Sequence, residues 1–128
     1  MKLYKPQVQL VRRTNVDEPD DYFLHAVTFC GRTSYRADGH NTIPESIDEN
    51  GVLAVELFLA QDAELPDYDY LTPIVHTIAL GRPAAAGEAF VVEVSLTDGG
   101  GNRASTDEGN TTTVSSMDAD EDSRPIGR

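Results

Sequence analysis

Apolar and polar residues alternate with a period of two along several stretches of this chain, which is the pattern of β-strands that bury one face. In the stretch 90–97 every second residue is large and apolar, and the stretch 74–80 alternates in the same way. The stretch 22–30 is apolar on both faces, which favours a central strand, and 7–10 predicts a further short strand. The predicted apolar faces are Phe90, Val92, Val94 and Leu96, and Ile74, His76, Ile78 and Leu80.

The stretch VELFLAQDAELPDYDYL (55–71) begins as an aliphatic run and continues as a string of acids and tyrosines. Its alanine, leucine and glutamate content would suit a helix. Three observations favour a strand that starts near Val52. An Asn-Gly turn signal (50–51) precedes it, a helical stripe would omit Phe58, and the neighbouring stretches are all predicted strands. The back half, 62–70, is then expected to be an exposed loop between two strands.

Turn-rich segments of Gly, Pro and Asp separate the predicted strands, and no crossover helix of the kind that joins parallel strands is evident. We therefore predict an all-β fold, an Ig-like antiparallel β-sandwich that spans 1–103. The connection 32–50 is long for a loop, so we expect it to hold one short strand, around 33–36 or 41–43.

The segment 104–128 is predicted to be an extended, acidic C-terminal tail. Between Ala104 and Ser123 it has six carboxylates and neither Lys nor Arg, a composition typical of disorder. If the tail is ordered, a neighbouring subunit is the simplest cause, because the tail has few apolar side chains. The part 111–116 has good β propensity and is expected to form a last strand or to augment a neighbour's sheet edge. The candidate interface residues there are Thr111, Thr112, Thr113 and Val114.

The chain is strongly acidic, with a formal net charge of −12. A surface of this charge repels phosphate backbones and anionic membrane surfaces, so no direct nucleic-acid or membrane partner is expected. Only two of the ten basic residues, Lys2 and Lys5, are lysine. An acidic, lysine-poor surface is typical of halophilic proteins, whose carboxylates are screened by salt. An ordinary acidic protein from an arginine-favouring genome would show the same composition.

Nothing in the chain predicts export or membrane insertion. The start, MKLYKPQVQL, lacks the apolar run of a signal peptide, and no stretch has the roughly 20 apolar residues of a membrane span. The single cysteine, Cys30, excludes an internal disulfide framework. We therefore expect a soluble protein made in a cytoplasm, although processing before Met1 stays open.

The central run of the chain resembles bacterial Ig-like β-sandwich modules of the CARDB (cell-adhesion-related) type over roughly 52–112. The matching text is the strand and acidic loop of 55–71, followed by AAAGEAFVVEVSLT (84–97) and the Asn-containing segment DGGGNRASTDEGNT. The chain departs from the family pattern at CGRTS, which lacks the usual N-x-G, and in 32–50, which has no clear counterpart. The resemblance implies a non-catalytic adhesion or spacer module and implies no active-site residues.

Four carboxylates in the acidic loop are candidate calcium ligands, because a hard cation needs several oxygen ligands from one loop. Their spacing is not that of an EF-hand, and no glycine provides the sharp turn, so a solvated acidic turn is the favoured interpretation and calcium the alternative. The candidate metal ligands are Asp62, Glu64, Asp67 and Asp69. Tyr68 and Tyr70, in the same loop, are expected either to form a protein interface or to cover the end of the core.

The histidines and the cysteine have simple structural interpretations. His25 and His76 lie on apolar strand faces without a second ligand nearby, so we expect them to be buried and hydrogen-bonded rather than zinc ligands. Cys30 ends a predicted strand and is expected to be a buried thiol, because no base or oxyanion site accompanies it. No G-x-S-x-G is present either. The sequence therefore predicts a protein that is not an enzyme and needs no cofactor, with Ca²⁺ as the one ligand left open.

These observations lead to two main hypotheses of function. The first is a structural assembly protein, most concretely a virion component such as a capsid decoration, neck or tail-appendage protein. It would assemble in a host cytoplasm and dock on neighbouring subunits, or on copies of itself, through its tail and sandwich surface. The alternative is a calcium- or carbohydrate-binding adhesion module of a cell-surface protein. A small protein inhibitor that presents sandwich loops is a third, weaker hypothesis.

Overall fold

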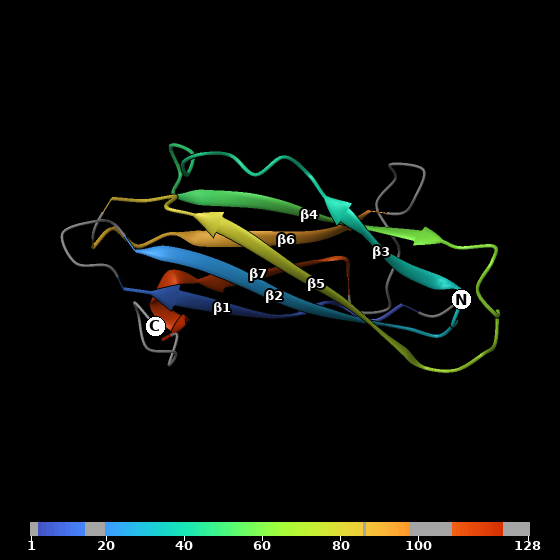
Figure 1. The fold of residues 1–128 in the computed structure, drawn as a ribbon. Coiled ribbons are helices and arrows are strands. Elements are labelled where there is room, and N and C mark those ends of the chain that lie inside the picture. Colours follow the sequence, from blue (N-terminus) through green and yellow to red (C-terminus); the bar gives the residue numbers. More distant parts are fainter. Residues whose placement is uncertain (1–2, 15–19, 86, 98–108, 122–128) are drawn as a thin grey trace, which may run out of the picture.

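The computed structural model describes residues 3–14, 20–85, 87–97 and 109–121. These residues form two four-stranded sheets that pack face to face, with no α-helix among them (Figure 1). The elements in chain order are β1 (Gln7–Arg13), β2 (Asp21–Cys30), β3 (Tyr35–His40), β4 (Val52–Gln61), β5 (Thr72–Gly81), β6 (Val91–Thr97), β7 (Thr111–Ser115), the short 3₁₀ helix η1 (Ser116–Asp118) and β8 (Asp120–Glu121).

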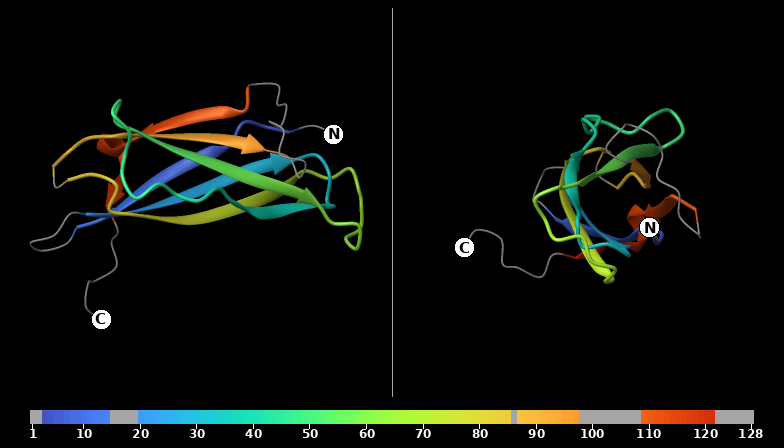
Figure 2. Two further views of the ribbon diagram at one scale, coloured as in Figure 1. Left: turned by 90° about the horizontal axis from the view of Figure 1, so that it is seen from above. Right: turned by 90° about the vertical axis from the view of Figure 1, so that its right-hand side faces the viewer.

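The first sheet, sheet A, has the strand order β5-β2-β1-β8, and the second, sheet B, has the order β3-β4-β6-β7. Figure 2 shows the two layers from above and end-on. The predicted all-β sandwich is therefore confirmed, but the sheets are mixed rather than purely antiparallel. β4 pairs with β6 and β1 pairs with β8 in parallel. β4 and β6 are parallel because β5, which follows β4, lies in sheet A and returns the chain, so that β6 runs in the same direction as β4.

The core lies between the sheets and is built from the apolar faces that the alternation predicts. In β4 the residues Leu53, Val55, Leu57 and Leu59 are buried, which confirms the strand interpretation of this stretch. The predicted faces of the stretches 90–97 and 74–80 are buried as well, and β4 extends one to two residues beyond its predicted apolar run. Each sheet thus buries one apolar face against the other sheet. This burial of apolar surface is the main favourable contribution to the stability of a sandwich.

β2 is the central strand that its two apolar faces predicted, because it pairs with β1 on one side and β5 on the other. Its buried face contains Leu24, which aligns with Leu10 in β1 and Ile78 in β5. The prediction of a buried His25 was wrong. His25 lies on the outer face, where its Nδ1 is 3.4 Å from Thr77 Oγ1. The alternation alone could not select the inner face, because both faces of this strand are apolar.

The connection 32–50 contains one strand, but β3 (Tyr35–His40) falls between the two predicted windows and overlaps only the first. Its pairing with β4 is interrupted, since Ala37 faces Leu59 and His40 faces Leu57. Two residues of β3 therefore lie opposite Phe58, which is a β-bulge. Gly39 within the bulge has a φ of 81°, a left-handed conformation that glycine adopts without strain.

A hydrogen bond joins the two sheets at this bulge. His76 on β5 is only 4% exposed, and its Nε2 lies 3.0 Å from the carbonyl oxygen of Phe58 on β4. Because a carbonyl can only accept, Nε2 carries the proton and the neutral ring leaves Nδ1 unprotonated. Burial lowers the pKa of His76, and the nearby charge of His40 acts in the same direction, whereas the carbonyls of Phe58 and Gly39 oppose the shift. His76 is thus the buried, hydrogen-bonded histidine that the sequence predicts.

The C-terminal segment 109–121 passes from one sheet to the other. β7 pairs with β6 at the edge of sheet B, η1 turns the chain, and β8 pairs with β1 at the edge of sheet A. The strand expected within 111–116 therefore adds to the chain's own sheet. The boundary predicted between residues 103 and 104 lies outside the described residues, as do the residues from 122 onward.

Polar contacts with the same chain hold this segment, so its described part does not need the neighbouring subunit that we expected to order it. The buried Ser116 accepts a hydrogen bond from the Phe90 amide through its Oγ (2.9 Å) and donates its own amide to the Phe90 carbonyl (2.8 Å). Gln9 donates to Asp120 (2.8 Å), and Arg12 forms an ion pair with Glu121. Backbone pairing and ion pairs thus replace the apolar burial that this stretch lacks.

Replacing His76 with Gln is expected to flatten the dependence of stability on pH. Because the folded-state pKa of His76 lies below that of the unfolded chain, the unfolded state binds the proton more readily. Wild-type stability should therefore fall as the pH decreases from about 7.5 to about 5.5, around the ordinary histidine pKa of about 6.5. Urea unfolding of both proteins across this range measures the effect, and parallel curves for the two proteins would refute it.

Replacing Ser116 with Ala should reduce the free energy of unfolding by about 1–3 kcal/mol, because the buried Phe90 amide loses its hydroxyl acceptor. Thr113→Ala on the exposed face of β7 is the matched control and should cost less. Chemical denaturation of the two variants gives the comparison. Equal losses would show that the segment is held by its strand pairing alone.

Candidate protein-binding loop

The exposed large apolar side chains gather on one connection, the loop between β4 and β5 (residues 62–71), which we call the tyrosine loop. Four of the six such side chains in the described residues belong to it, and the other two lie in β5 and η1. The four are Leu65, Tyr68, Tyr70 and Leu71. The tyrosine loop and η1 are at opposite ends of the sandwich (Figure 1; Figure 2, left).

The two tyrosines face solvent. Tyr68 is 58% exposed and Tyr70 is 68% exposed, and their ring centroids are 5.9 Å apart with planes tilted by 44°. Of the two roles that the sequence allowed, covering the end of the core is therefore excluded for both rings. Exposed neighbouring aromatic side chains are a typical feature of protein-binding surfaces.

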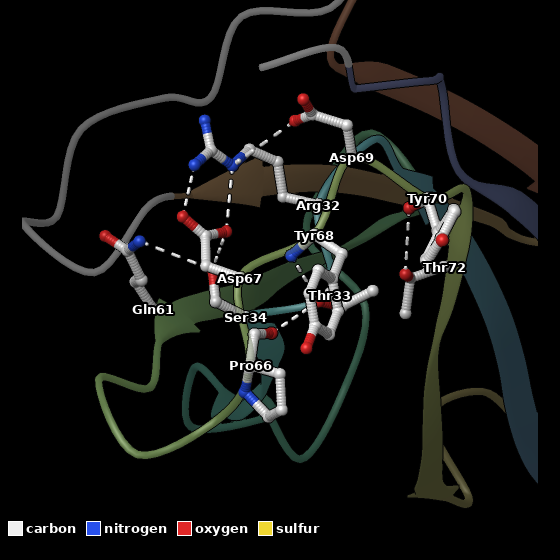
Figure 3. A network of polar contacts seen from close by, with 10 residues as sticks. All are labelled: Arg32, Thr33, Ser34, Gln61, Pro66, Asp67, Tyr68, Asp69, Tyr70 and Thr72. Carbon is white, nitrogen blue, oxygen red and sulfur yellow. Dashed lines mark hydrogen bonds and ion pairs between the residues drawn. The ribbon is translucent and has the colours of Figure 1, made fainter.

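An ion pair fixes the tyrosine loop to the turn that follows β2 (Figure 3). Both guanidinium nitrogens on one side of Arg32 donate to Asp67, with a distance of 2.9 Å from Nε to Oδ1. The buried Ser34 donates to the same carboxylate oxygen at 2.8 Å, and Gln61 donates to Ser34 at 3.3 Å. The carboxylate of Asp67 is thus held by two residues of another connection, in the bidentate arrangement that gives arginine–carboxylate pairs their directionality.

The backbone of the tyrosine loop is anchored directly as well. The amide of Thr33 donates to the carbonyl of Tyr68 (3.0 Å), and the amide of Tyr68 donates to the hydroxyl of Thr33 (2.8 Å). That hydroxyl donates in turn to the carbonyl of Pro66. At the start of the loop, Asp62 donates its amide to the carbonyl of Ser34 (2.8 Å). These hydrogen bonds fix the backbone of the loop and do not involve its large apolar side chains, which stay exposed to solvent.

The carboxylates of the loop differ in environment. The hydrogen bond from Arg32 holds the pKa of Asp67 below its ordinary range, and the hydrogen bond from Ser34 acts in the same direction. Asp69 is 91% exposed and only reaches within 4.0 Å of Arg32. The carboxylate of Asp62 accepts a hydrogen bond from the amide of Glu64 (3.0 Å), and its Oδ2 lies 3.6 Å from Nε of Arg36. The loop therefore combines exposed apolar side chains with a partly neutralised acidic rim.

The structure does not bring the four candidate metal ligands together. The described residues contain no group of three or more His, Cys, Asp or Glu side chains that could hold a metal ion. The carboxylate of Asp67 is paired with Arg32, which lies 35 residues earlier in the chain. The calcium site thus stays a prediction, without a coordinating cluster in this structure.

The other predicted interface residues lie elsewhere. Thr111, Thr112, Thr113 and Val114 belong to β7, the edge strand of sheet B, with Thr113 exposed and Val114 packed against the core. Cys30 is buried as predicted, and burial raises the pKa of its thiol. A pocket of about 400 Å³, which no sequence pattern predicted, adjoins the tyrosine loop through Leu71. It is lined by Tyr4, Lys5, Pro6, Gln7, Phe29 and Leu71.

No protein-family model, curated protein or solved structure matches the chain. The resemblance to the CARDB-type modules therefore stays an expectation. Among the described residues, no helix has the length and apolar character that a membrane crossing requires.

Replacing Arg32 with Gln, or Asp67 with Asn, is expected to loosen the tyrosine loop without unfolding the sandwich. Chymotrypsin should cut after Tyr68 or Tyr70 about two- to fivefold faster, since an exposed ion pair contributes modestly. Limited proteolysis followed by mass spectrometry measures the rates. The control is Arg82→Gln, which removes an ion pair with Asp21 on β2. Equal rates in wild type and both loop variants would show that the backbone hydrogen bonds suffice to hold the loop.

Proposed function

We propose that this protein is a non-enzymatic structural assembly protein that binds a neighbouring protein subunit through the tyrosine loop. The observation that carries the proposal is the gathering of Leu65, Tyr68, Tyr70 and Leu71 on one exposed, fixed connection. A patch of this kind costs free energy in water, and in soluble proteins such a patch commonly marks an interaction site.

The anchoring of the loop supports binding rather than a merely tolerated exposure. Tyr68 is tied to Thr33 by two hydrogen bonds, and Asp67 is held by Arg32. A loop that is already ordered loses little conformational entropy on binding, so more of the contact energy becomes affinity. Tyrosine adds large contact area with few rotatable bonds, which explains its frequent role as an anchor in protein interfaces.

The charges around the loop indicate the chemistry of the partner. The largely exposed Asp69 lies between the two tyrosines and the partly exposed Asp62 lies at the start of the loop, within a chain whose net charge is −12. A partner surface with apolar pockets and a basic or neutral rim would match this arrangement, whereas another acidic rim would be repelled. The partner is therefore expected to be a protein and neither a nucleic acid nor an anionic membrane.

The most concrete form of the proposal is a virion component, such as a capsid decoration, neck or tail-appendage protein, assembled in a host cytoplasm. A sandwich that needs no disulfide and presents one end loop to a neighbour suits such a role. The described part of the C-terminal tail belongs to the sandwich itself, with β7 at the edge of sheet B and β8 at the edge of sheet A.

The double variant Tyr68→Ser/Tyr70→Ser tests the proposal in the native assembly. Tagged wild-type and variant chains are expressed in the producing cells, and their incorporation into the purified particle or complex is quantified. The variant should be incorporated at least about tenfold less, because two interface anchors of this type are each worth 1 kcal/mol or more. Its fold should be unchanged, because both side chains are exposed.

The control is Met117→Ser, which removes an exposed apolar side chain in η1, at the other end of the sandwich. It should be incorporated like the wild type. Full incorporation of the tyrosine variant would exclude the loop as the docking site. A deletion of 104–128 is not a suitable test, because it removes β7 and β8 and with them one edge of each sheet.

A further inference from the structure

The two sheets end in four edge strands, and three of these are protected against pairing with another chain. β3 carries Arg36 and Asp38 and contains the bulge, β7 has only five residues, and β8 consists of two acidic residues. Charges, bulges and short length are the usual means by which natural sheets prevent edge-to-edge association. β5 is long and uncharged, because its ten residues, TPIVHTIALG, include no Asp, Glu, Lys or Arg, and its one register shift lies at its end, between Ala79 and Gly81.

β5 is open on one side. Its pairing with β2 runs from one end of the strand to the other, while sheet A has no strand beyond it. β3 passes nearby in the other sheet, where Gly39 lies close to His76, but no backbone hydrogen bond joins β3 to β5 within the described residues. A row of backbone amides and carbonyls on β5 is thus available to another strand, except at Pro73, which has no amide hydrogen.

The outward face of β5 suits close approach. Its side chains alternate, with Ile74, His76 and Ile78 in the core and Val75, Thr77 and Ala79 exposed. Val75 is 57% exposed although it is β-branched and apolar. Small and β-branched side chains without charge form favourable cross-strand pairs and place no like charges opposite one another.

We propose that two copies of this chain associate edge to edge through β5, antiparallel about a two-fold axis, so that two four-stranded sheets A form one continuous sheet. A second copy is the partner that fits, because the same uncharged strand then meets itself. Two chains that each carry a net charge of −12 repel one another, and β5 is the longest edge strand without a charged side chain. An isologous contact of this kind closes after two subunits.

The arrangement has a consequence for the tyrosine loop. Because β5 begins directly after this loop, an antiparallel pair places the two tyrosine loops at opposite ends of the dimer. One dimer would then present two binding loops that face away from each other. Simultaneous engagement of both loops would raise the avidity for a repeating partner surface without any new contact.

Sedimentation velocity of the full chain over a roughly hundredfold range of concentration tests the proposal. The wild type should shift from monomer to dimer, and Val75→Lys and Thr77→Lys should weaken the dimer by about tenfold or more through like charges across the axis. Ala54→Lys places the same charge on the exposed face of the internal strand β4 and should leave the dimer intact. A wild type that stays monomeric throughout would overturn the proposal.

Two further measurements keep this result separate from the proposed function of the tyrosine loop. The Tyr68→Ser/Tyr70→Ser variant should still dimerise, and a dimer that this variant loses would place the contact at the loop instead. Amide hydrogen exchange of residues 74–80 should slow as the wild-type concentration rises, because the outward amides of β5 become hydrogen-bonded. A dimer whose β5 amides exchange at the monomer rate would overturn the assignment to this edge.

Discussion

Buried backbone amides and carbonyls need hydrogen-bond partners, and in this sandwich side chains supply them at a bulge and at the start of a strand. The bulge in β3 interrupts the pairing opposite Phe58, and His76 reaches across from the other sheet to its carbonyl. The amide of Phe90 lies just before β6 and donates a hydrogen bond to the hydroxyl of Ser116. Both contacts join segments that belong to different parts of the chain. Only the contact of His76 also joins the two sheets, so a polar contact between β5 and β4 adds to the apolar core in holding them together.

The same requirement shapes the tyrosine loop. Its backbone finds partners in the turn after β2, where Thr33 and Ser34 provide hydroxyls and main-chain groups. The main-chain groups of the loop thus bond to this turn, while its large apolar side chains and the carboxylate of Asp69 face water. The hydrogen bonding of the main chain fixes the loop without burying these side chains. It explains how a loop with exposed Tyr68 and Tyr70 can still hold a single conformation.

The parts of this fold that local periodicity specifies could be predicted from the sequence. The faces of β4 and β6 are of this kind, because one face of each is clearly more apolar. The side of β2 that is buried could not be predicted, since Leu24 and His25 lie on faces of similar apolar content. The parallel pairing of β4 with β6 depends on where β5 goes, which no local pattern specifies. The acidic loop suggested a metal site because its carboxylates are close together in the sequence. The ion pair between Asp67 and Arg32 could not be predicted, because the two residues are far apart in the chain.

β8 forms the edge of sheet A next to β1, so sheet A is complete only after the C-terminal segment has been synthesised. Gln9 contacts Asp120, a residue 111 positions later, so the earliest strand of the sheet waits for one of the last segments to be synthesised. Contacts of such large sequence separation form slowly, because the intervening chain must first be brought together. During translation the nascent chain therefore carries a half-built sheet with two open edges, β1 and β5, until synthesis has passed residue 121. Its acidic charge keeps neighbouring nascent chains apart during this period.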